Sequence, residues 1–389
     1  MIRIRKGADR RVRAGHLWIF SNEIEDPPVG DLQPGSIHEV TDGAGEFVGM
    51  AYANPRSLIA ARVLSRKRRD IDEEFFRSRF EAALERKTRL AASLDSDSYR
   101  LIFGEGDLVP GLVVDKYRDV LVIQALTAGI DAKIELIVSE LVSLLQPAGV
   151  FLRNDVSARE LEGLPKEKRL AHGSVPETVQ VRLRGMEFLV DIVNGQKTGF
   201  YLDQEFNRAL MDRHVREGAK VLDLFSYTGA WGIRAAKAGA GEVVAVDSSR
   251  GALNLAEANA ELNGVAGVFS TVREPVLEFL KKSQDTWDLI VLDPPAFIKS
   301  RALVKEGIKG YIDINRRALL RLGSGGILVT CSCSHHLDEG SFEELIASAS
   351  RQSGRELRIL EKGGQGPDHP ALLAMPETRY LKLMAVQVV

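Results

Sequence analysis

The second half of this chain alternates strand and helix patterns, and this alternation limits the available folds more than any other feature of the sequence. From Asn194 onward, short apolar runs recur, and most of them are separated by residues with helical spacing. Strands connected in this way pair in parallel and carry helices on both faces of the sheet. We therefore expect strands near residues 220–225, 242–247, 267–272, 289–293, 327–331, 356–360 and 381–388. Only a short connection without a long helical pattern joins the last two, which favours an antiparallel final strand.

The first half is organised differently and predicts two smaller pieces. Short β-rich runs alternate with glycine and proline turns over the first 72 residues, as in a small, curled β-domain. Residues 71–94 have helical spacing and no Gly or Pro, so we expect a linking helix. A small α/β unit follows, with expected strands at 108–115, 120–124 and 149–152, a helix at 130–145 and a hairpin at 179–193. The expected domains are 1–72, 73–187 and 188–389.

Composition and charge narrow the function classes. The apolar runs are far shorter than a membrane span, and two cysteines spaced i, i+2 cannot cross-link distant parts of a fold. We therefore expect a cytoplasmic protein without a membrane partner. The net charge of −2 does not indicate a nucleic-acid binder, yet basic residues cluster at Arg3, Arg5, Lys6, Arg10, Arg11, Arg13, Arg66, Lys67, Arg68 and Arg69. Such clusters suit a phosphate backbone, and ordinary solvated surface charge is the alternative interpretation.

The only two cysteines, Cys331 and Cys333, follow an apolar run at 326–329 that reads as a buried strand. Ligands of open α/β sheets bind at the carboxyl ends of the strands, so a thiol at this place is directed at an active site. Asp293 ends the neighbouring expected strand. Core packing is the alternative role for a cysteine. A metal site with the two following histidines is another alternative, but we expect no metal because no second ligand pair is evident.

Residues 221–232 read as a strand, a tight turn and the start of a helix. Gly229 and Gly232 would let the backbone approach a ligand and let the helix pack on the strand. Asp223 precedes the turn, where a carboxylate suits a cationic amino-acid group better than a pyrophosphate. Three polar residues replace the glycines of a dinucleotide fingerprint: Ser226, Tyr227 and Thr228. The turn therefore favours S-adenosylmethionine (SAM), with Asp247 placed to bind ribose hydroxyls.

Four segments resemble one known family. Residues 194–204, with Asn207 and Arg208, resemble the opening motif of class I RNA methyltransferases that carry an N-terminal PUA domain. The resemblance is specifically to the bacterial family that methylates C5 of a cytosine in large-subunit ribosomal RNA. Residues 15–24, 104–112 and 310–315 resemble its PUA start, its central domain and its helix after Asp-Pro-Pro. The resemblance spans nearly the whole chain. It implies an N-terminal PUA β-barrel, a small central α/β domain and a Rossmann-like class I methyltransferase sheet.

The same resemblance implies SAM as cofactor, large-subunit ribosomal RNA as partner and two sets of site residues. We expect cofactor contacts from Lys197, Thr198, Gly199, Phe200, Asp203, Asp223, Ser226, Tyr227, Thr228, Gly229, Asp247, Ser248, Glu274 and Asp293. The family often places an acid after the third strand, where this chain has Arg273-Glu274-Pro275, so either Glu274 in a shifted register or backbone groups hold the adenine. Substrate contacts are expected from Pro294, Pro295, Phe297, Lys299, Arg10 and Arg11. The oligomeric state stays open, a homodimer included.

The chemistry implied by the resemblance needs a thiol. A thiolate added to C6 of cytosine turns C5 into a carbon that can attack a methyl group. We expect Cys331 as the nucleophile because Thr330-Cys331-Ser332 resembles the Thr-Cys-Ser of other cytosine-C5 RNA methyltransferases, with Cys333 as the alternative. Asp293 would bind the N3 or N4 edge of the base. Three other functions stay open: methylation of uracil C5, methylation of an adenine N6 or guanine N2 amine, and RNA binding by a non-catalytic assembly factor.

Overall fold

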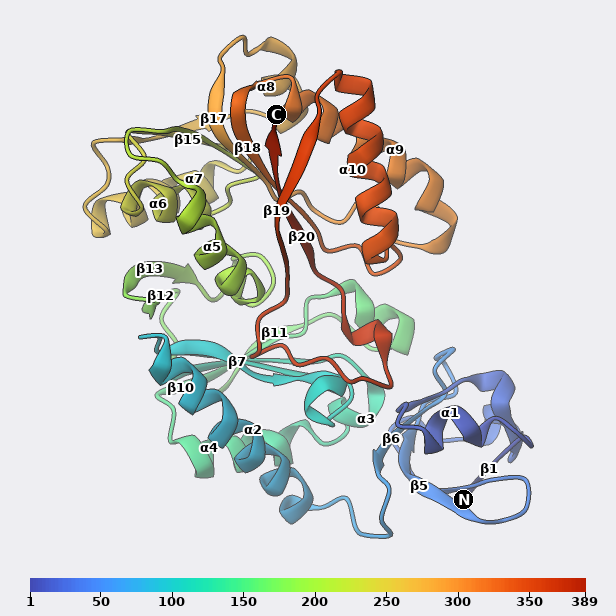
Figure 1. Cartoon of the computed structure of the whole chain (residues 1–389). Helices are drawn as coiled ribbons and strands as arrows, with labels where there is room; N and C mark the ends of the chain where they lie inside the picture. The colour runs from blue at the N-terminus through green and yellow to red at the C-terminus, as the bar shows by residue number, and fades with distance from the viewer. The chain divides into compact units, whose positions relative to one another are not determined.

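The computed structural model describes all 389 residues and divides into two compact units (Figure 1). Unit 1 comprises Met1–Gly185, Val190–Leu202 and Pro367–Thr378, and unit 2 comprises Met186–Leu189, Asp203–Gly366 and Arg379–Val389. This division is coarser than the three expected domains, whose boundaries at residues 72 and 187 stay a prediction. No helix combines the length and the apolar character that crossing a membrane requires.

Unit 1 begins with the small β-domain that the glycine and proline turns predict. Six strands form a sheet in the order β2-β6-β5-β4-β1-β3. Their bounds are β1 Ile2–Ile4, β2 Trp18–Ile19, β3 Ile24–Asp26, β4 Ile37–Thr41, β5 Phe47–Ala53 and β6 Ala61–Ser65. The short helix α1 (Asp9–Arg13) contributes Val12 to a core that includes Ile4 and Ile19. The expected β-rich start is confirmed as a mixed six-stranded sheet.

A second sheet in unit 1 has the order β11-β10-β9-β8-β7. Its strands are β7 Ser98–Phe103, β8 Leu112–Tyr117, β9 Val120–Ala125, β10 Gly149–Arg153 and β11 Lys168–Gly173. The expected linking helix is α2 (Glu73–Ser93), capped by the Asp72 side chain, which accepts from the Phe75 amide at 3.0 Å. The single helix expected over 130–145 is wrong: α3 (Ala128–Asp131) and α4 (Ile134–Leu145) are separated at Lys133, whose φ of −113° is not helical. The expected hairpin is β12 (Thr178–Leu183) with β13 (Met186–Asp191).

Unit 2 contains a seven-stranded sheet in the order β16-β15-β14-β17-β18-β20-β19. The strands are β14 Lys220–Leu224, β15 Glu242–Asp247, β16 Phe269–Arg273, β17 Trp287–Leu292, β18 Leu322–Ser332, β19 Leu357–Gly364 and β20 Lys382–Val388. The first five are parallel, and β20 runs antiparallel to both neighbours, as expected. The helices are α5 Glu205–Met211, α6 Ala230–Lys237, α7 Arg250–Leu262, α8 Val276–Lys282, α9 Val304–Leu319 and α10 Glu339–Ser353.

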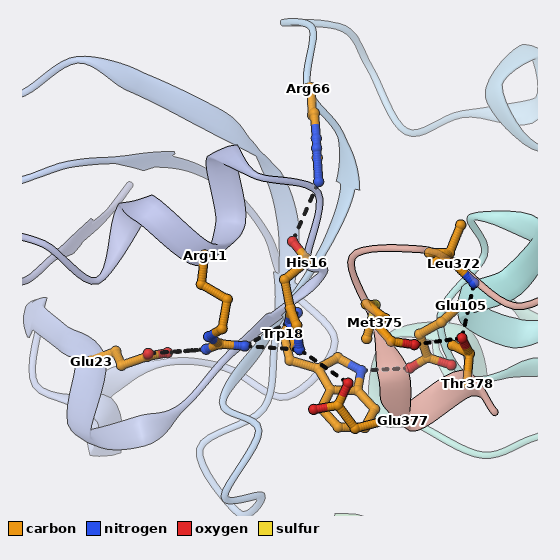
Figure 2. Close-up of polar contacts among 10 residues, drawn as sticks. All are labelled: Arg11, His16, Trp18, Glu23, Arg66, Glu105, Leu372, Met375, Glu377 and Thr378. Carbon is orange, nitrogen blue, oxygen red and sulfur yellow. Dashed lines mark hydrogen bonds and ion pairs between the residues drawn. The ribbon is translucent and has the colours of Figure 1, made fainter. Parts of the chain in front are cut away.

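The connection between β19 and β20 contains a segment that belongs to unit 1, residues Pro367–Thr378, which we call the strap. Buried Asp368 accepts a hydrogen bond from the Arg100 amide at 3.2 Å, and Met375 is fully buried in the core of the small β-domain. Figure 2 shows Glu377 at the His16 ring, with 3.5 Å between Oε2 and Nε2. The sequence pattern showed only the absence of a long helix here, because contacts across hundreds of residues leave no local periodicity.

Candidate active site

The turn after β14 has an unusual backbone. Phe225 and Tyr227 are not glycines, yet they have φ values of +61° and +48°. Gly229 follows at +78° and caps α6, where a Cβ would lie 3.0 Å from the side chains of Ala256 and Phe269. Each left-handed non-glycine residue costs on the order of 1 kcal/mol, and such strain is concentrated at functional sites. The turn between β14 and α6 therefore holds a strained, defined backbone conformation.

Beside this turn, three buried polar side chains have atoms without a hydrogen-bond partner in the protein. Asp223 is fully buried, and its Oδ2 accepts from the Gly232 amide at 2.9 Å while its Oδ1 has no partner. The hydroxyl groups of Ser226 and Thr228 are also buried and unpartnered. Burial raises the pKa of Asp223 to about 7, and the nearby carboxylates of Asp293 and Asp247 act in the same direction.

Unpaired buried polar atoms are costly, and a bound ligand would supply the partners that they lack. An ammonium group, as in the amino-acid part of SAM, would satisfy the open oxygen of Asp223. The two hydroxyl groups can donate or accept, so they suit a carboxylate or an amine. The residues of this turn therefore fit SAM.

Asp247, at the end of β15, is oriented by two backbone amides. Its Oδ2 accepts from Tyr227 at 3.0 Å and its Oδ1 from Ser249 at 2.9 Å, while the neighbouring Ser248 is exposed. The remaining lone pairs of this carboxylate suit hydroxyl donors, such as those of a ribose. Glu274 forms an ion pair with Lys282, so its carboxylate already has a cationic partner. Its expected contact with adenine stays a prediction.

Asp293 directly follows β17 and is held by two side chains that the sequence did not suggest. Its carboxylate accepts from Gln204 Nε2 at 3.0 and 2.9 Å and from Trp231 Nε1 at 3.1 Å. Gln204 is in turn fixed by Asn207, whose Nδ2 donates to its Oε1 at 2.6 Å. Asp203 accepts from the Tyr380 hydroxyl at 2.6 Å. The expected Asp293 is therefore an oriented acceptor at the sheet's carboxyl edge.

The two cysteines lie in different surroundings at the end of β18. Cys331 is inside the strand and fully buried, and burial, with the nearby Asp293 carboxylate, raises the pKa of its thiol well above the usual value. Cys333 lies just beyond the strand and is half-buried. The serines on either side of Cys333, Ser332 and Ser334, each contact the Tyr311 hydroxyl of α9 at 3.0 Å. No group of three or more His, Cys, Asp or Glu side chains is arranged to hold a metal ion.

The loop after Asp293 contains the expected base-contacting residues. Pro294 is buried, whereas Pro295 and Lys299 are exposed. The Phe297 ring packs on the Tyr311 ring of α9 with 4.7 Å between centroids. Phe297 is therefore a half-buried wall of the loop, and its expected contact with a base stays a prediction.

Four expected cofactor residues, Lys197 to Phe200, belong to unit 1 and have partners there. The Thr198 hydroxyl donates to Asp115 Oδ2 at 2.5 Å and contacts the Tyr117 hydroxyl at 3.0 Å. The Phe200 amide donates to the same Tyr117 hydroxyl at 3.2 Å, and Lys197 lies over the Tyr201 ring. Gly199 has a φ of +130°, and a Cβ would lie 2.7 Å from Val190. These contacts give the motif a structural role, and its cofactor contacts stay a prediction.

The two arginines expected to contact RNA, Arg10 and Arg11, differ in how many contacts they make within the protein. Arg11 is paired with Glu23 at 2.9 Å (Figure 2). Its guanidinium also lies over the Phe20 ring, so most of it is used within the β-domain. Arg10 is exposed. The sequence could not distinguish the two, because the partners of Arg11 lie on other elements.

Comparisons with known proteins agree with this architecture. A family described as PUA-like domain matches residues 2–66, and one described as S-adenosylmethionine-dependent methyltransferase matches residues 168–375. A protein of Aeromonas salmonicida named ribosomal RNA large subunit methyltransferase I is 39% identical over 389 residues, with 98% of each chain covered. Proteins of the same name from Vibrio cholerae and Cronobacter sakazakii are 38% and 36% identical, again with 98% of each chain covered.

Two solved structures share the fold over the whole chain. SMU.776, crystallised in complex with SAH, superposes with a TM-score of 0.87 at 21% identity and 100% coverage of both chains. A Streptococcus mutans protein described as a SAM-dependent methyltransferase gives a TM-score of 0.85 at 22% identity, also with 100% coverage. The chain therefore shares its fold with solved structures.

Proposed function

The chain belongs to the ribosomal RNA large subunit methyltransferase I family of SAM-dependent methyltransferases, and on that premise we propose that it forms 5-methylcytidine in large-subunit ribosomal RNA. The observation that carries the proposal is the half-buried thiol of Cys333. Cys333 follows β18, and Asp293 follows the neighbouring parallel strand β17. Methylation of an exocyclic amine needs no such thiol, whereas methylation at C5 of a pyrimidine does.

SAM supplies an electrophilic methyl group. The chain's task is to bind the donor and orient it, and the unpartnered atoms of Asp223, Ser226 and Thr228 support that assignment. The two fixed oxygens of Asp247 suit the ribose hydroxyls. Asp223 and Asp247 lie at the carboxyl ends of the adjacent parallel strands β14 and β15, and Ser226 and Thr228 follow β14. Open α/β folds bind their ligands at these strand ends.

The pyrimidine is activated by a thiolate. Cysteine sulfur adds to C6, and the electrons displaced from the C5–C6 double bond make C5 nucleophilic. C5 then takes the methyl group, and a base removes the C5 proton. The electrons of that C–H bond re-form the double bond and expel the thiolate, so the enzyme is regenerated without net oxidation or reduction.

The surroundings of the two thiols favour Cys333 over Cys331 as nucleophile, the reverse of the order expected from the sequence. A fully buried thiol with a raised pKa carries little thiolate at neutral pH, which disfavours Cys331. Cys333 is half-buried, and the ammonium of Lys382 donates to the carbonyl of the next residue, Ser334, at 2.7 Å. Cys331 stays the alternative, because two residues along an extended chain share a face.

Asp293 is assigned to the base edge. Gln204 and Trp231 fix the plane of its carboxylate, so it presents oriented acceptors to the N4 amino group of a cytosine. Uracil has an oxygen at that position, which would face a carboxylate without a proton between them. This contrast supports cytosine over uracil as substrate.

Ribosomal RNA as substrate is supported by the names of the relatives and by the PUA-like match at residues 2–66. Exposed basic residues of that domain, among them Arg10, Lys67 and Arg69, suit the sugar-phosphate backbone. We assign RNA contact to residues 1–72, retain 73–187 as a central domain and place methyl transfer in residues 188–389.

The experiment uses ribosomal RNA from a strain that lacks this protein, incubated with SAM and enzyme and analysed as nucleosides by mass spectrometry. Wild-type enzyme should produce 5-methylcytidine, and Cys333→Ala should lower the rate at least about 1000-fold because the covalent route is lost. Cys331→Ala is the matched control and should retain at least about a tenth of the activity. Both variants should bind SAM with wild-type affinity, measured by calorimetry.

RNA carrying 5-fluorocytidine tests the covalent step directly. Fluorine at C5 cannot leave as a proton, so the sulfur–C6 bond should persist in a complex that resists denaturation. An N-methylated nucleoside, or methylation by a variant lacking both cysteines, would contradict the proposal. A trapped complex with Cys333→Ala and none with Cys331→Ala would transfer the role to Cys331.

A further inference from the structure

We propose that Lys382 is a positioning residue for Cys333, fixing the backbone beside the thiol and holding its thiolate with the ammonium charge. This inference rests on the proposed role of Cys333. Lys382 is the first residue of β20 and pairs with Ser332, the last residue of β18, across the antiparallel ladder. The final strand thus places Lys382 opposite Ser332, the residue before Cys333, although the two are 50 positions apart in the sequence.

Lys382 holds the chain directly after Cys333. Its side chain is buried, with 9% of the residue exposed, and its ammonium donates to the Ser334 carbonyl at 2.7 Å and to the Tyr380 carbonyl at 2.8 Å. The serines on both sides of Cys333 contact the Tyr311 hydroxyl. Both neighbours of Cys333 are therefore held by buried groups.

The two carbonyl acceptors are neutral, so the ammonium still lacks a full counter-charge. Burial lowers the pKa of Lys382 to about 8, while Cys333 and Asp338 favour its charged form. Asp338 is exposed and caps α10, where it accepts from the Ser341 amide at 2.8 Å. A thiolate at Cys333 would supply the missing negative charge inside the protein, where such a pair is stronger than in water.

Other titratable groups around the pair are Cys331 on β18, Tyr311 on α9 and His335, whose ring stacks on Tyr380. Burial raises the pKa of both Cys331 and Tyr311, which keeps them neutral near pH 7. The strand register and the hydrogen bond to the Ser334 carbonyl therefore place the Lys382 ammonium at the segment that holds Cys333. A free cysteine is only a few per cent thiolate at neutral pH, so an adjacent ammonium increases the reactive fraction.

The test measures the reactivity of Cys333 without RNA. Full-length enzyme is alkylated with iodoacetamide between pH 5.5 and 10, and the rate at Cys333 is followed by peptide mass spectrometry. Buried Cys331 is the internal reference. In Lys382→Met the midpoint of the rate profile should move up by about one pH unit, and the rate at pH 7 should fall about tenfold.

Two further variants separate charge from geometry. Lys382→Gln can still donate to the Ser334 carbonyl but has no charge, so its profile should move as in Lys382→Met. Lys382→Arg keeps the charge and should restore the wild-type midpoint to within about 0.3 units. Methylation by Lys382→Gln should show a kcat at least about tenfold lower, with the KM for RNA and the Kd for SAM within about twofold of wild type.

An unchanged alkylation profile in folded Lys382→Gln would overturn the inference. So would a profile that moves equally in Lys382→Arg, because the ammonium charge would then not be responsible. If Lys382→Met fails to fold, the glutamine and arginine variants decide the question. A wrong nucleophile assignment is detected separately, as an active Cys333→Ala enzyme, and does not depend on the alkylation result.

Discussion

Asp115 in unit 1 and Asp223 in unit 2 are both fully buried carboxylates, and they are satisfied in opposite ways. Arg100 donates to both oxygens of Asp115 at 2.7 Å, and the Thr198 hydroxyl adds a third donor. Asp223 accepts one backbone amide and leaves an oxygen without a partner. The first arrangement is complete in the protein alone, whereas the second leaves one acceptor without a partner.

Burial alone therefore does not distinguish a structural acid from a binding one. A buried ion pair with ideal geometry offsets much of its desolvation cost, but removing one member leaves a buried charge behind. An acid with an open oxygen instead carries a desolvation cost that the protein does not offset and that a bound cation would relieve. The raised pKa of Asp223 records that cost.

The largest effect is expected for Asp115→Asn. The substitution leaves the buried Arg100 guanidinium without its counter-charge, so the free energy of unfolding should fall by about 3–5 kcal/mol. Urea denaturation measures the change, and Asp70→Asn, at an exposed aspartate, is the matched control. A loss below about 1 kcal/mol would mean that the pair contributes no more than a surface ion pair.

Asp223→Asn should have the opposite signature. Loss of the charge-assisted contact should weaken SAM binding about tenfold or more at pH 8, while the apoprotein should be no less stable than wild type. The pKa of Asp223 is higher in the folded than in the unfolded protein, so between about pH 4 and pH 7 the folded state binds a proton that the unfolded state has lost. Wild-type stability is therefore lost as pH rises from about 4 to about 7, and the variant should lack that loss.

The same carboxyl predicts how SAM binding depends on pH in the wild type. Below pH 7 the carboxyl is increasingly protonated, so affinity for the cationic donor should fall as pH drops from 8 to 6. Calorimetry at both values measures the change. If the asparagine variant shows an equal dependence, the titrating group is not Asp223.

Thr228→Val should give the smallest effect. The buried hydroxyl has no partner in the protein, so its replacement by an apolar group of the same shape should change the free energy of unfolding by less than about 1 kcal/mol. SAM binding should weaken about three- to tenfold if the hydroxyl contacts the donor. Differential scanning calorimetry with and without SAM tests both statements, and unchanged affinity would remove Thr228 from the site.

The fold was largely predictable because most strands of the seven-stranded sheet, such as β14, β15, β17 and β20, are local apolar runs. The expected strands at 242–247 and 381–388 agree with β15 and β20 to within a residue, and the antiparallel final strand is confirmed. The single helix expected at 130–145 was wrong because apolar spacing continues across Lys133, whose non-helical φ leaves no mark on that spacing. Strand β11 was missed, since its residues are mostly polar or exposed.

The site was predictable only where its residues follow their own strands. Asp223, Asp293 and the cysteines stand at or beside strand ends, which is why the sequence pattern pointed to them, and their roles stay predictions. Gln204, Trp231, Tyr311 and Lys382 act on those residues from other elements, and no spacing in the sequence joins them. Which of the two thiols is half-exposed likewise depends on where β18 ends.

The strap also decides how this protein can be dissected. The chain passes between the two units five times, and the last two passages bracket Pro367–Thr378. A fragment starting at residue 203 would therefore retain the strap but lose the core around Met375, leaving that apolar side chain in water. A fragment ending at residue 202 would lack the strap entirely. Expressing either half as one continuous piece thus leaves a defect, and biochemical work on the catalytic sheet requires the full-length chain.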